Sequence, residues 1–180
     1  GNRVTNEYDA GGRLVAETDA QGRTTRFTHD AGGNLAGMTN ADGKQTSYEY
    51  DALNRMVKKT LPNGKFVSTA WNIDGTRKSV TDAAGNVIAF GYDPLGRLDK
   101  VTETNAAGTQ LTGYGFDAAG NNISQTDAEG RTTRWEYDAG KRAVARTLPG
   151  GQTERFTYGA AGAATGHTDF NGQLTTTSSA

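Results

Sequence analysis

A unit of 21 residues recurs along this chain and constrains its fold more than any other feature. The unit begins at a slot filled by an aromatic or histidine side chain, in turn Tyr8, His29, Tyr50, Trp71, Tyr92, Phe116, Tyr137 and Tyr158. Successive slots are 21 residues apart, except for a spacing of 24 between Tyr92 and Phe116, where three extra residues lie around residues 103–107. A period of this length indicates stacked units, each burying a little surface against its neighbours.

Each unit contains two turn patterns that end in glycine. The first turns end at Gly12, Gly33, Asn54, Gly75, Gly96, Gly120, Lys141 and Gly162, and the second at Gly22, Gly43, Gly64, Gly85, Gly108, Gly130, Gly151 and Gly172. A threonine ten residues after each slot precedes the second turn: Thr18, Thr39, Thr60, Thr81, Thr102, Thr126, Thr147 and Thr168. Asp or Asn at the first turn position accepts a backbone hydrogen bond, and glycine at the fourth suits a left-handed residue that closes a type I turn with a bulge. In two second turns, Leu-Pro replaces the first two residues, and proline pre-sets the φ angle that the turn requires.

About six residues separate successive turns, and they are rich in Thr, Val and aromatic side chains, as strands are. Residues two apart share a face, so pairs such as Phe27 with His29 and Tyr48 with Tyr50 form an aromatic ladder on one side of a sheet. The sequence therefore predicts an all-β fold: an antiparallel meander of β-hairpin repeats over residues 1–174, twisted and curved, with a frayed tail at 175–180. Gly1 occupies a second-turn position, and we expect open edge strands at both ends that self-associate or pair with the rest of a parent chain.

Composition narrows the function. The formal net charge is −1 and there is no cysteine, so we expect no nucleic-acid partner and no cysteine-bound metal. No apolar run approaches the roughly 20 residues of a membrane span. Hydrophobic residues make up only 34% of the chain, which favours a thin, repetitive structure over one compact core.

Catalytic, cofactor and metal sites are not predicted. His29 fills a packing slot and His167 lacks ligands at metal-site spacing. The repeated Asp-to-Gly spacing fits turns better than calcium loops, and near-identical aspartates offer no acid–base pair. Asn122-Ile123-Ser124 matches a glycosylation acceptor. The recurrent Arg13, Arg55, Arg97 and Arg142 either bind acidic sugars or, as we favour, are solvated or pair with acidic residues across strands.

The signature Tyr-Asp-x-x-Gly-Arg-Leu, present at residues 8–14 and 92–98, resembles the YD repeat of the Rhs family. The resemblance extends from Tyr8 to Gly172, with His29, Asn54, Lys141 and Gly159 as departures. The family includes bacterial polymorphic toxins, the C subunits of insecticidal toxin complexes and the teneurins. The resemblance implies a hollow β-shell, which in the toxins encloses a variable C-terminal toxin domain. The family's self-cleavage boundary is not expected at Asp93-Pro94, because normal repeats continue on both sides.

The leading hypothesis is a structural wall segment of such a toxin-enclosing shell, with no enzymatic activity. Its partners would be neighbouring repeats and the enclosed toxin domain, in a bacterial parent that is secreted, for example by type VI secretion, or delivered to the cell surface. The alternative is an exposed adhesion or carbohydrate-binding array. The positions expected to carry the structural signature are Tyr8, Asp9, Gly12, Thr18, Gly22, Tyr50, Asp51, Thr60, Gly64, Trp71, Gly75, Tyr92, Asp93, Gly96, Phe116, Asp117, Gly120, Tyr137, Asp138 and Tyr158.

Overall fold

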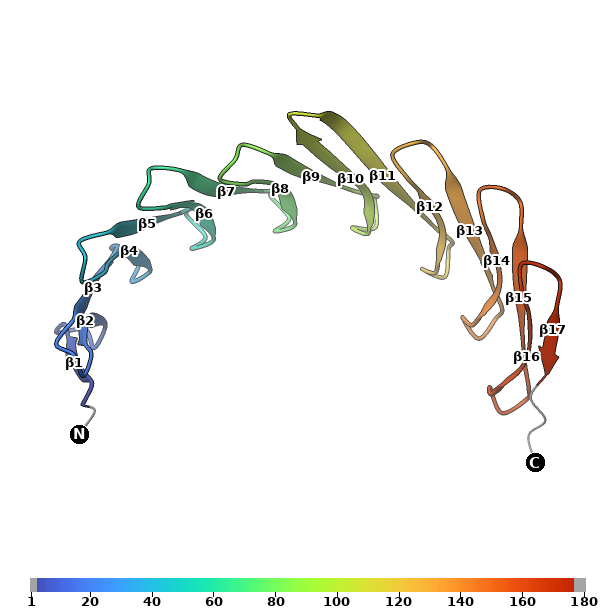
Figure 1. The fold of residues 1–180 in the computed structure, drawn as a ribbon, viewed down its shortest axis with the longest axis horizontal. Coiled ribbons are helices and arrows are strands. Elements are labelled where there is room, and N and C mark those ends of the chain that lie inside the picture. Colours follow the sequence, from blue (N-terminus) through green and yellow to red (C-terminus); the bar gives the residue numbers. More distant parts are fainter. Residues whose placement is uncertain (1–2, 177–180) are drawn as a thin grey trace. The chain divides into compact units, whose positions relative to one another are not determined.

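The computed structural model describes residues 3–176, which form β-strands joined by short turns, with no helix in that range (Figure 1). The chain divides into two compact units, residues 1–89 and 90–180. The first contains β1 (Thr5–Tyr8), β2 (Leu14–Thr18), β3 (Thr24–His29), β4 (Leu35–Thr39), β5 (Gln45–Tyr50), β6 (Met56–Thr60), β7 (Phe66–Trp71) and β8 (Arg77–Thr81), and β9 (Val87–Tyr92) begins in it. The second contains β10 (Leu98–Asn105), β11 (Gly108–Phe116), β12 (Asn122–Thr126), β13 (Thr132–Tyr137), β14 (Ala143–Thr147), β15 (Thr153–Tyr158), β16 (Ala164–Thr168) and β17 (Leu174–Thr176).

Within each unit, every strand pairs antiparallel with the next strand along the chain. In the first unit this succession extends from β1 to β9, and in the second from β10 to β17. The predicted all-β antiparallel meander is thus confirmed. No segment of residues 3–176 is a helix that could cross a membrane.

The two kinds of hairpin differ in register. At the second turns the pairing is regular, as in Glu17 opposite Thr25 and Thr18 opposite Thr24. At the first turns one residue is skipped: Thr28 lies opposite Gly37, but His29 lies opposite Leu35. The same shift occurs between β5 and β6, β7 and β8, β13 and β14, and β15 and β16. Because of this β-bulge, Met38 and Leu35, the partners of Phe27 and His29, can point to the same face.

The bulge helps to separate two faces, which we call the aromatic face and the polar face. The aromatic face carries pairs such as Phe27 opposite Met38 and Tyr48 opposite Lys59. The predicted sharing of a face by alternate aromatic residues therefore fits the register. Their direct cross-strand partners are not aromatic, however, because a strand of aliphatic, polar or charged residues intervenes between the aromatic strands of successive repeats.

The polar face is lined by small and polar side chains, such as the row Thr28, Gly37 and Ser47. Among the described residues, Ala16 and Ala145 are the hydrophobic side chains that are fully buried, each with 1% exposure. Large residues such as Leu53, Leu95 and Ile73 are exposed at turns. The protein is therefore held together by strand pairing and by contacts between neighbouring repeats, with little central core.

The three extra residues lengthen one hairpin and leave its neighbours unchanged. β10 and β11 have 8 and 9 residues, and they pair from Lys100 opposite Gly113 to Asn105 opposite Gly108. At the C-terminal end, Thr175 and Thr176, which the sequence assigned to a frayed tail, belong to β17. The remainder of that predicted tail, and the predicted turn position of Gly1, lie outside the described residues.

Candidate functional site: the repeated turns and the arginine clamp

Where a turn begins with aspartate, that residue organises the turn through its backbone and its side chain. At Asp9, the backbone N–H of Gly12 donates to the Asp9 carbonyl at 3.0 Å, and the Asp9 N–H donates to the Arg13 carbonyl at 2.9 Å. One carboxylate oxygen of Asp9 accepts the backbone N–H groups of Gly11 and Arg13, both at 2.9 Å. The other carboxylate oxygen lies 2.7 Å from Nε of Arg13. A single aspartate thus satisfies donors from three later positions, and this explains its recurrence.

The fourth position of each turn is left-handed, as the sequence predicts. The glycines there have positive φ angles, for example 76° at Gly12 and 77° at Gly22. The two substitutes for glycine adopt the same conformation, with φ of 59° at Asn54 and 61° at Lys141. Asparagine tolerates this region, whereas a lysine in it carries a steric cost. The turn therefore requires a positive φ angle at its fourth position, and residues other than glycine can adopt it at an energetic cost.

Hydrogen bonds in the turns lower the pKa of the turn aspartates below the ordinary value of 3.8. For Asp51 the largest cause is the hydrogen bond from the Arg55 side chain, followed by the Arg55 backbone N–H. For Asp30 the side chain of Asn34 has the same role. The pKa is lowered in this way at Asp9, Asp19, Asp30, Asp51, Asp82, Asp93, Asp117, Asp127 and Asp138. These carboxylates are held ionised by turn donors, and none is raised toward the range of a general acid.

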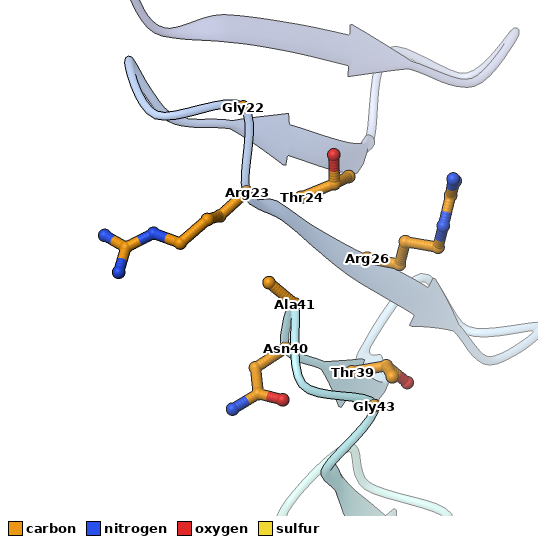
Figure 2. A pocket seen from close by; sticks show the side chains of 8 residues that line it. All are labelled: Gly22, Arg23, Thr24, Arg26, Thr39, Asn40, Ala41 and Gly43. Atoms are coloured by element: carbon orange, nitrogen blue, oxygen red, sulfur yellow. The ribbon is translucent and has the colours of Figure 1, made fainter.

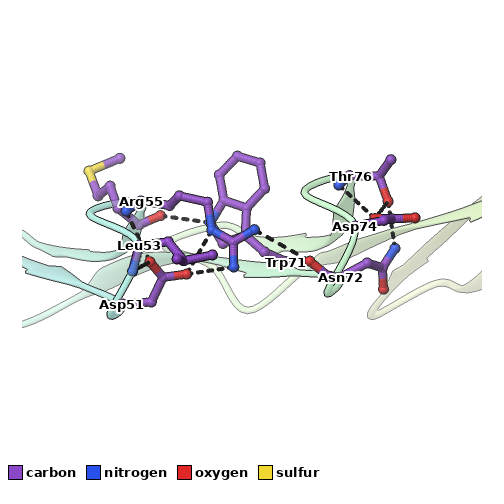
Figure 3. A network of polar contacts seen from close by, with 8 residues as sticks. Asp51, Leu53, Arg55, Trp71, Asn72, Asp74 and Thr76 are labelled. Atoms are coloured by element: carbon purple, nitrogen blue, oxygen red, sulfur yellow. Dashed lines mark hydrogen bonds and ion pairs between the residues drawn. The ribbon is translucent and has the colours of Figure 1, made fainter.

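The arginine that follows a first turn reaches the next repeat, and we call this contact the arginine clamp. Figure 3 shows it at Arg55, whose guanidinium lies 2.7 Å from the Asp51 carboxylate and 5.3 Å from the Trp71 ring centroid. Its Nη1 donates to the backbone carbonyl of Asn72 at 3.3 Å. One guanidinium thus joins the turn of its own repeat to the ring and the turn of the following repeat.

The clamp recurs in the second unit. Arg97 pairs with Asp93 at 2.7 Å, stacks over Phe116 at 4.7 Å and donates to the Asp117 carbonyl at 3.0 Å. Arg142 likewise pairs with Asp138 and stacks over Tyr158 at 4.7 Å. The expectation that these arginines pair with a neighbouring acidic residue is confirmed, but the partner is an aspartate four residues earlier in the same turn and does not lie further along a neighbouring strand. Cation–π contacts of this kind contribute about 0.5–1 kcal/mol at exposed sites.

Clamp arginines occur in every second repeat. The residue at this position is Arg13, Asn34, Arg55, Thr76, Arg97, Asn121, Arg142 and Ala163 in turn. Asn34 makes a shorter link, since its amide donates to its own Asp30 carboxylate at 3.0 Å and to Asn54 of the next first turn at 2.8 Å. The alternation is visible in the sequence once repeats are compared in pairs, but it was not used in the sequence analysis.

Some slot side chains also donate hydrogen bonds to backbone carbonyls of the preceding repeat. The hydroxyl groups of Tyr50 and Tyr158 donate to the carbonyls of Leu35 and Ala143, at 3.1 and 2.7 Å, and Nε1 of Trp71 donates to the Met56 carbonyl at 3.2 Å. Each of these acceptors lies 15 residues before its donor. Slot and clamp together therefore join adjacent repeats from both directions.

The second turns that begin with Asp19, Asp82, Asp127 and Asp169 use the same aspartate chemistry, and they lie open to solvent. The strands on either side of some second turns are joined by threonine pairs, such as Thr18 with Thr24 at 2.9 Å. Figure 2 shows a depression of about 440 Å³ between two successive second turns, lined by Arg23, Arg26 and Asn40 among others. Arg23 and Arg26 point in different directions there, and Arg23 is paired with Asp19. A similar depression lies between the next two second turns, so it reflects repeat spacing and gathers no reactive groups.

The signature positions fall into three structural classes. The tyrosine, tryptophan and phenylalanine residues end strands β1, β5, β7, β9, β11, β13 and β15. The aspartates begin first turns, the glycines have positive φ, and Thr18 and Thr60 end strands β2 and β6. They do not converge on one point but repeat along each unit.

The histidines and the acceptor motif do not form sites of their own. His29 ends β3 opposite Leu35, in its slot. His167 stacks on Phe156 at 4.9 Å, and its Nε2 lies 3.0 Å from the buried carboxylate of Glu154, which also faces Arg146. Within residues 3–176, no three His, Asp or Glu side chains form a possible metal cluster. Asn122 lies within β12 with its amide oxygen buried, unlike a glycosylation acceptor on a surface loop.

Comparison with known families identifies the repeat. The sequence pattern of the RHS Repeat family matches residues 8–45, 33–65, 74–110 and 116–153. The chain belongs to the RHS repeat family. The matches cover most of the hairpins, including those with Asn54 and Lys141 at the left-handed position. A comparison with curated proteins gave no match.

Solved structures show the same fold at low sequence identity. The TcdB2–TccC3 structure without the hypervariable C-terminal region matches with a TM-score of 0.65 and 16% identity, over 96% of this chain and 12% of that one. TcdB2–TccC3–TEV matches with 0.62 and 20%, over 92% and 10%. The Tc holotoxin pore of Photorhabdus luminescens matches with 0.54 and 18%, over 96% and 9%. The chain thus spans about a tenth of the length of these solved chains, and the likeness concerns the fold.

Proposed function

We propose that this RHS repeat segment is part of the wall of a hollow shell that encloses a toxin domain within a longer parent chain. The proposal rests on the partners of the side chains that recur along the repeats. Slot side chains donate hydrogen bonds to the preceding repeat, and clamp arginines donate to the following repeat. Turn aspartates accept hydrogen bonds from their own turns. The recurrent polar groups thus stabilise the contacts between repeats, as expected for a structural segment.

The neighbouring structures support the same proposal. The fold lies within TcdB2–TccC3 assemblies, and one of those structures is described as lacking a hypervariable C-terminal region. By analogy, the parent of this chain is a secreted or surface-delivered bacterial toxin whose variable region lies inside the shell. The partners of the segment are then the adjacent repeats and the enclosed domain. The segment itself performs no chemistry.

The alternative, an exposed array that binds acidic sugars through its arginines, is less well supported. An array of that kind needs guanidinium groups free to face solvent on each repeat. Arg55, Arg97 and Arg142 are instead engaged by a carboxylate and an aromatic ring. Their remaining exposure is limited, at 24%, 28% and 37% of the side chain.

Electron microscopy and limited proteolysis of the full parent protein test the proposal. We expect a closed shell around internal density, with this segment in its wall and the C-terminal region resistant to protease. The triple variant Arg55→Ala, Arg97→Ala, Arg142→Ala should expose that region, whereas Arg23→Ala and Arg131→Ala together, which alter only second turns, should not. A solid particle, or a C-terminal region cleaved as fast in the wild type as in the triple variant, would contradict a container.

A further inference from the structure

The four first turns of each compact unit are separated by three junctions, and the middle junction of each unit lacks a clamp arginine. The outer junctions start from a clamp position filled by Arg13, Arg55, Arg97 and Arg142. The middle junctions start from Asn34 and Asn121. The step that follows Thr76 leads from one unit to the other. Asparagine carries no guanidinium, so neither middle junction has the cation–π contact of the clamp.

Both exceptions to glycine at the left-handed fourth position lie at these middle junctions. Asn54 ends the first turn that follows Asn34, and Lys141 ends the first turn that follows Asn121. The first turns that follow a clamp arginine end in glycine, at Gly33, Gly75, Gly120 and Gly162. Two departures from the repeat pattern, the missing arginine and the replaced glycine, therefore occur together once in each unit.

The side chain of Asn54 joins the two turns at its junction. Its Oδ1 accepts a hydrogen bond from Nδ2 of Asn34 at 2.8 Å. The same Nδ2 of Asn34 also donates to the Asp30 carboxylate at 3.0 Å, so it bridges its own turn and the next one. A Cβ added at Gly32 would lie 3.1 Å from Oδ1 of Asn54, so glycine at this position leaves room for the close approach. A chain of side-chain hydrogen bonds thus crosses the junction in place of a guanidinium.

Lys141 makes a corresponding link in the opposite direction. Its Nζ donates to the backbone carbonyl of Ala119, in the preceding first turn, at 2.9 Å. Asn121 is engaged within its own turn, because its side-chain amide donates to the Asp117 carboxylate at 2.7 Å. The lysine of the following repeat therefore supplies the bond to a turn carbonyl that a clamp arginine supplies from the preceding repeat.

The backbone conformation of both residues indicates that their side chains have a role. Asn54 and Lys141 are the non-glycine residues with positive φ in the described part of the chain, at 59° and 61°. Residues with a Cβ are disfavoured in this region, lysine more than asparagine. Strained backbone of this kind persists where its surroundings compensate for it. Glycine would form either turn more easily, but it would provide no side chain to cross the junction.

We propose that Asn54 and Lys141 are substitute clamps, positioning residues that join successive first turns where the clamp arginine is absent. This inference rests on the proposed structural function of the segment and adds two residues to those that join its repeats. The links lie within the 180-residue chain and involve no enclosed domain. A measurement on this chain therefore tests the substitute clamps separately from the enclosure of a toxin.

Urea unfolding of the 180-residue chain tests the role of Lys141 through a double-mutant cycle with position 121. Lys141→Met keeps the length of the side chain and the backbone cost but removes the donor, so it should raise the unfolding equilibrium constant about threefold. Lys141→Arg keeps a donor and should leave the constant near that of the wild type. Lys65→Met, at an exposed lysine beside a second turn, is the matched control and should have no effect.

Asn121→Arg installs an arginine four residues after Asp117, with the Tyr137 ring in the following slot. In this background the guanidinium joins the two turns, so Lys141→Met should no longer raise the unfolding constant. The loss of the effect distinguishes a link across the junction from a general contribution of the lysine, which would be the same in both backgrounds.

The first unit provides an independent cycle. Asn54→Gly is measured in the wild type and in the Asn34→Arg background, and the backbone change is the same in both. The unfolding constants should therefore differ by about threefold between backgrounds, in favour of the arginine background, because only the wild type loses a link. An unchanged constant in Lys141→Met, or equal effects in both backgrounds of either cycle, would overturn the proposal. If Asn121→Arg fails to fold, the cycle of Asn34 and Asn54 decides the outcome.

Discussion

The first turns and the second turns have nearly the same backbone but different surroundings. Both close with a left-handed fourth residue, and both hold an aspartate that accepts two backbone N–H groups. In the first turns, the arginine side chain lies against the next aromatic ring, and 28% of Arg97 is exposed. In the second turns the matching arginine points to solvent, and 63% of Arg131 is exposed. Turn formation and the joining of repeats are therefore separate functions, and only the joining of repeats requires the aromatic side chain in the slot.

The largest expected effect comes from acid, and it should affect both kinds of turn alike. The folded state lowers the pKa of the turn aspartates, chiefly through arginine and asparagine donors, so it binds fewer protons than the unfolded chain. Stability is then present above the ordinary pKa of about 3.8 and is lost as the pH falls through the lower folded values. Urea unfolding followed by circular dichroism should show little change from pH 7 to 5 and a steep loss below about pH 4.

The acid experiment sharpens the comparison if it is read by residue. Amide NMR signals of Gly11, in a first turn, and Gln21, in a second turn, should shift over the same pH range. A first turn that titrates alone would contradict the view that both turns share one carboxylate chemistry.

The next effect concerns a clamped ring. Trp71→Ala removes the indole hydrogen bond to Met56 and the contacts with Arg55 and Arg77. A hydrogen bond contributes about 1 kcal/mol and each cation–π contact about 0.5–1 kcal/mol, so the free energy of unfolding should fall by about 2–3 kcal/mol. Phe66→Ala is the matched control, since Phe66 starts β7 near a second turn and is 45% exposed. If urea unfolding showed equal losses of unfolding free energy from the two substitutions, the distinction between first and second turns would be contradicted.

A smaller effect is expected from the arginines themselves. Arg97→Ala should lower the free energy of unfolding by about 1–2 kcal/mol, because it removes the ring contact and the bond to the Asp117 carbonyl. Arg131→Ala, at a second turn, should leave unfolding unchanged within error, since exposed ion pairs contribute little. A double-mutant cycle between Arg97 and Phe116 measures the clamp directly, and a coupling energy of zero would argue against it.

The smallest effect concerns the left-handed positions. Lys141→Gly relieves a lysine held at a φ of 61° and should stabilise the second unit by about 0.4–1 kcal/mol, less the bond from its ammonium group to the Ala119 carbonyl. Asn54→Gly is the comparison, and its gain should be smaller because asparagine tolerates this conformation. Thermal unfolding of both variants checks the order, and a larger gain at Asn54 would contradict it.

The turns could be predicted from the sequence because their determinants are local. Asp and Gly at fixed spacing specify the hydrogen bonds and the φ angle within four residues, and the strands between them follow. The bulge at the turn glycine was predicted, but the separate register shift between Thr28 and His29 was not, because it depends on strand pairing and leaves no characteristic residue. The clamp was missed because its ring lies 16 residues or more from its arginine, although the Asp-x-x-x-Arg spacing within each first turn was a usable signal.

The buried amide oxygen of Asn122 shows a different limit of sequence reasoning. Asn122 was noticed only as part of a glycosylation pattern, because that pattern is read along the chain. The unsatisfied state of its amide oxygen depends on the packing of two strands, which composition and spacing do not specify.

Because arginine occurs at the clamp position in alternate repeats, the natural module of this array is a pair of hairpin repeats about 42 residues long. Deletion or duplication of one repeat would bring two repeats of the same kind together, either with two consecutive clamps or with two consecutive gaps. Loss or gain of a whole pair preserves the order. Arrays of this type can therefore change length during evolution with the least disturbance in even steps, and an engineered shortening should remove two repeats at a time.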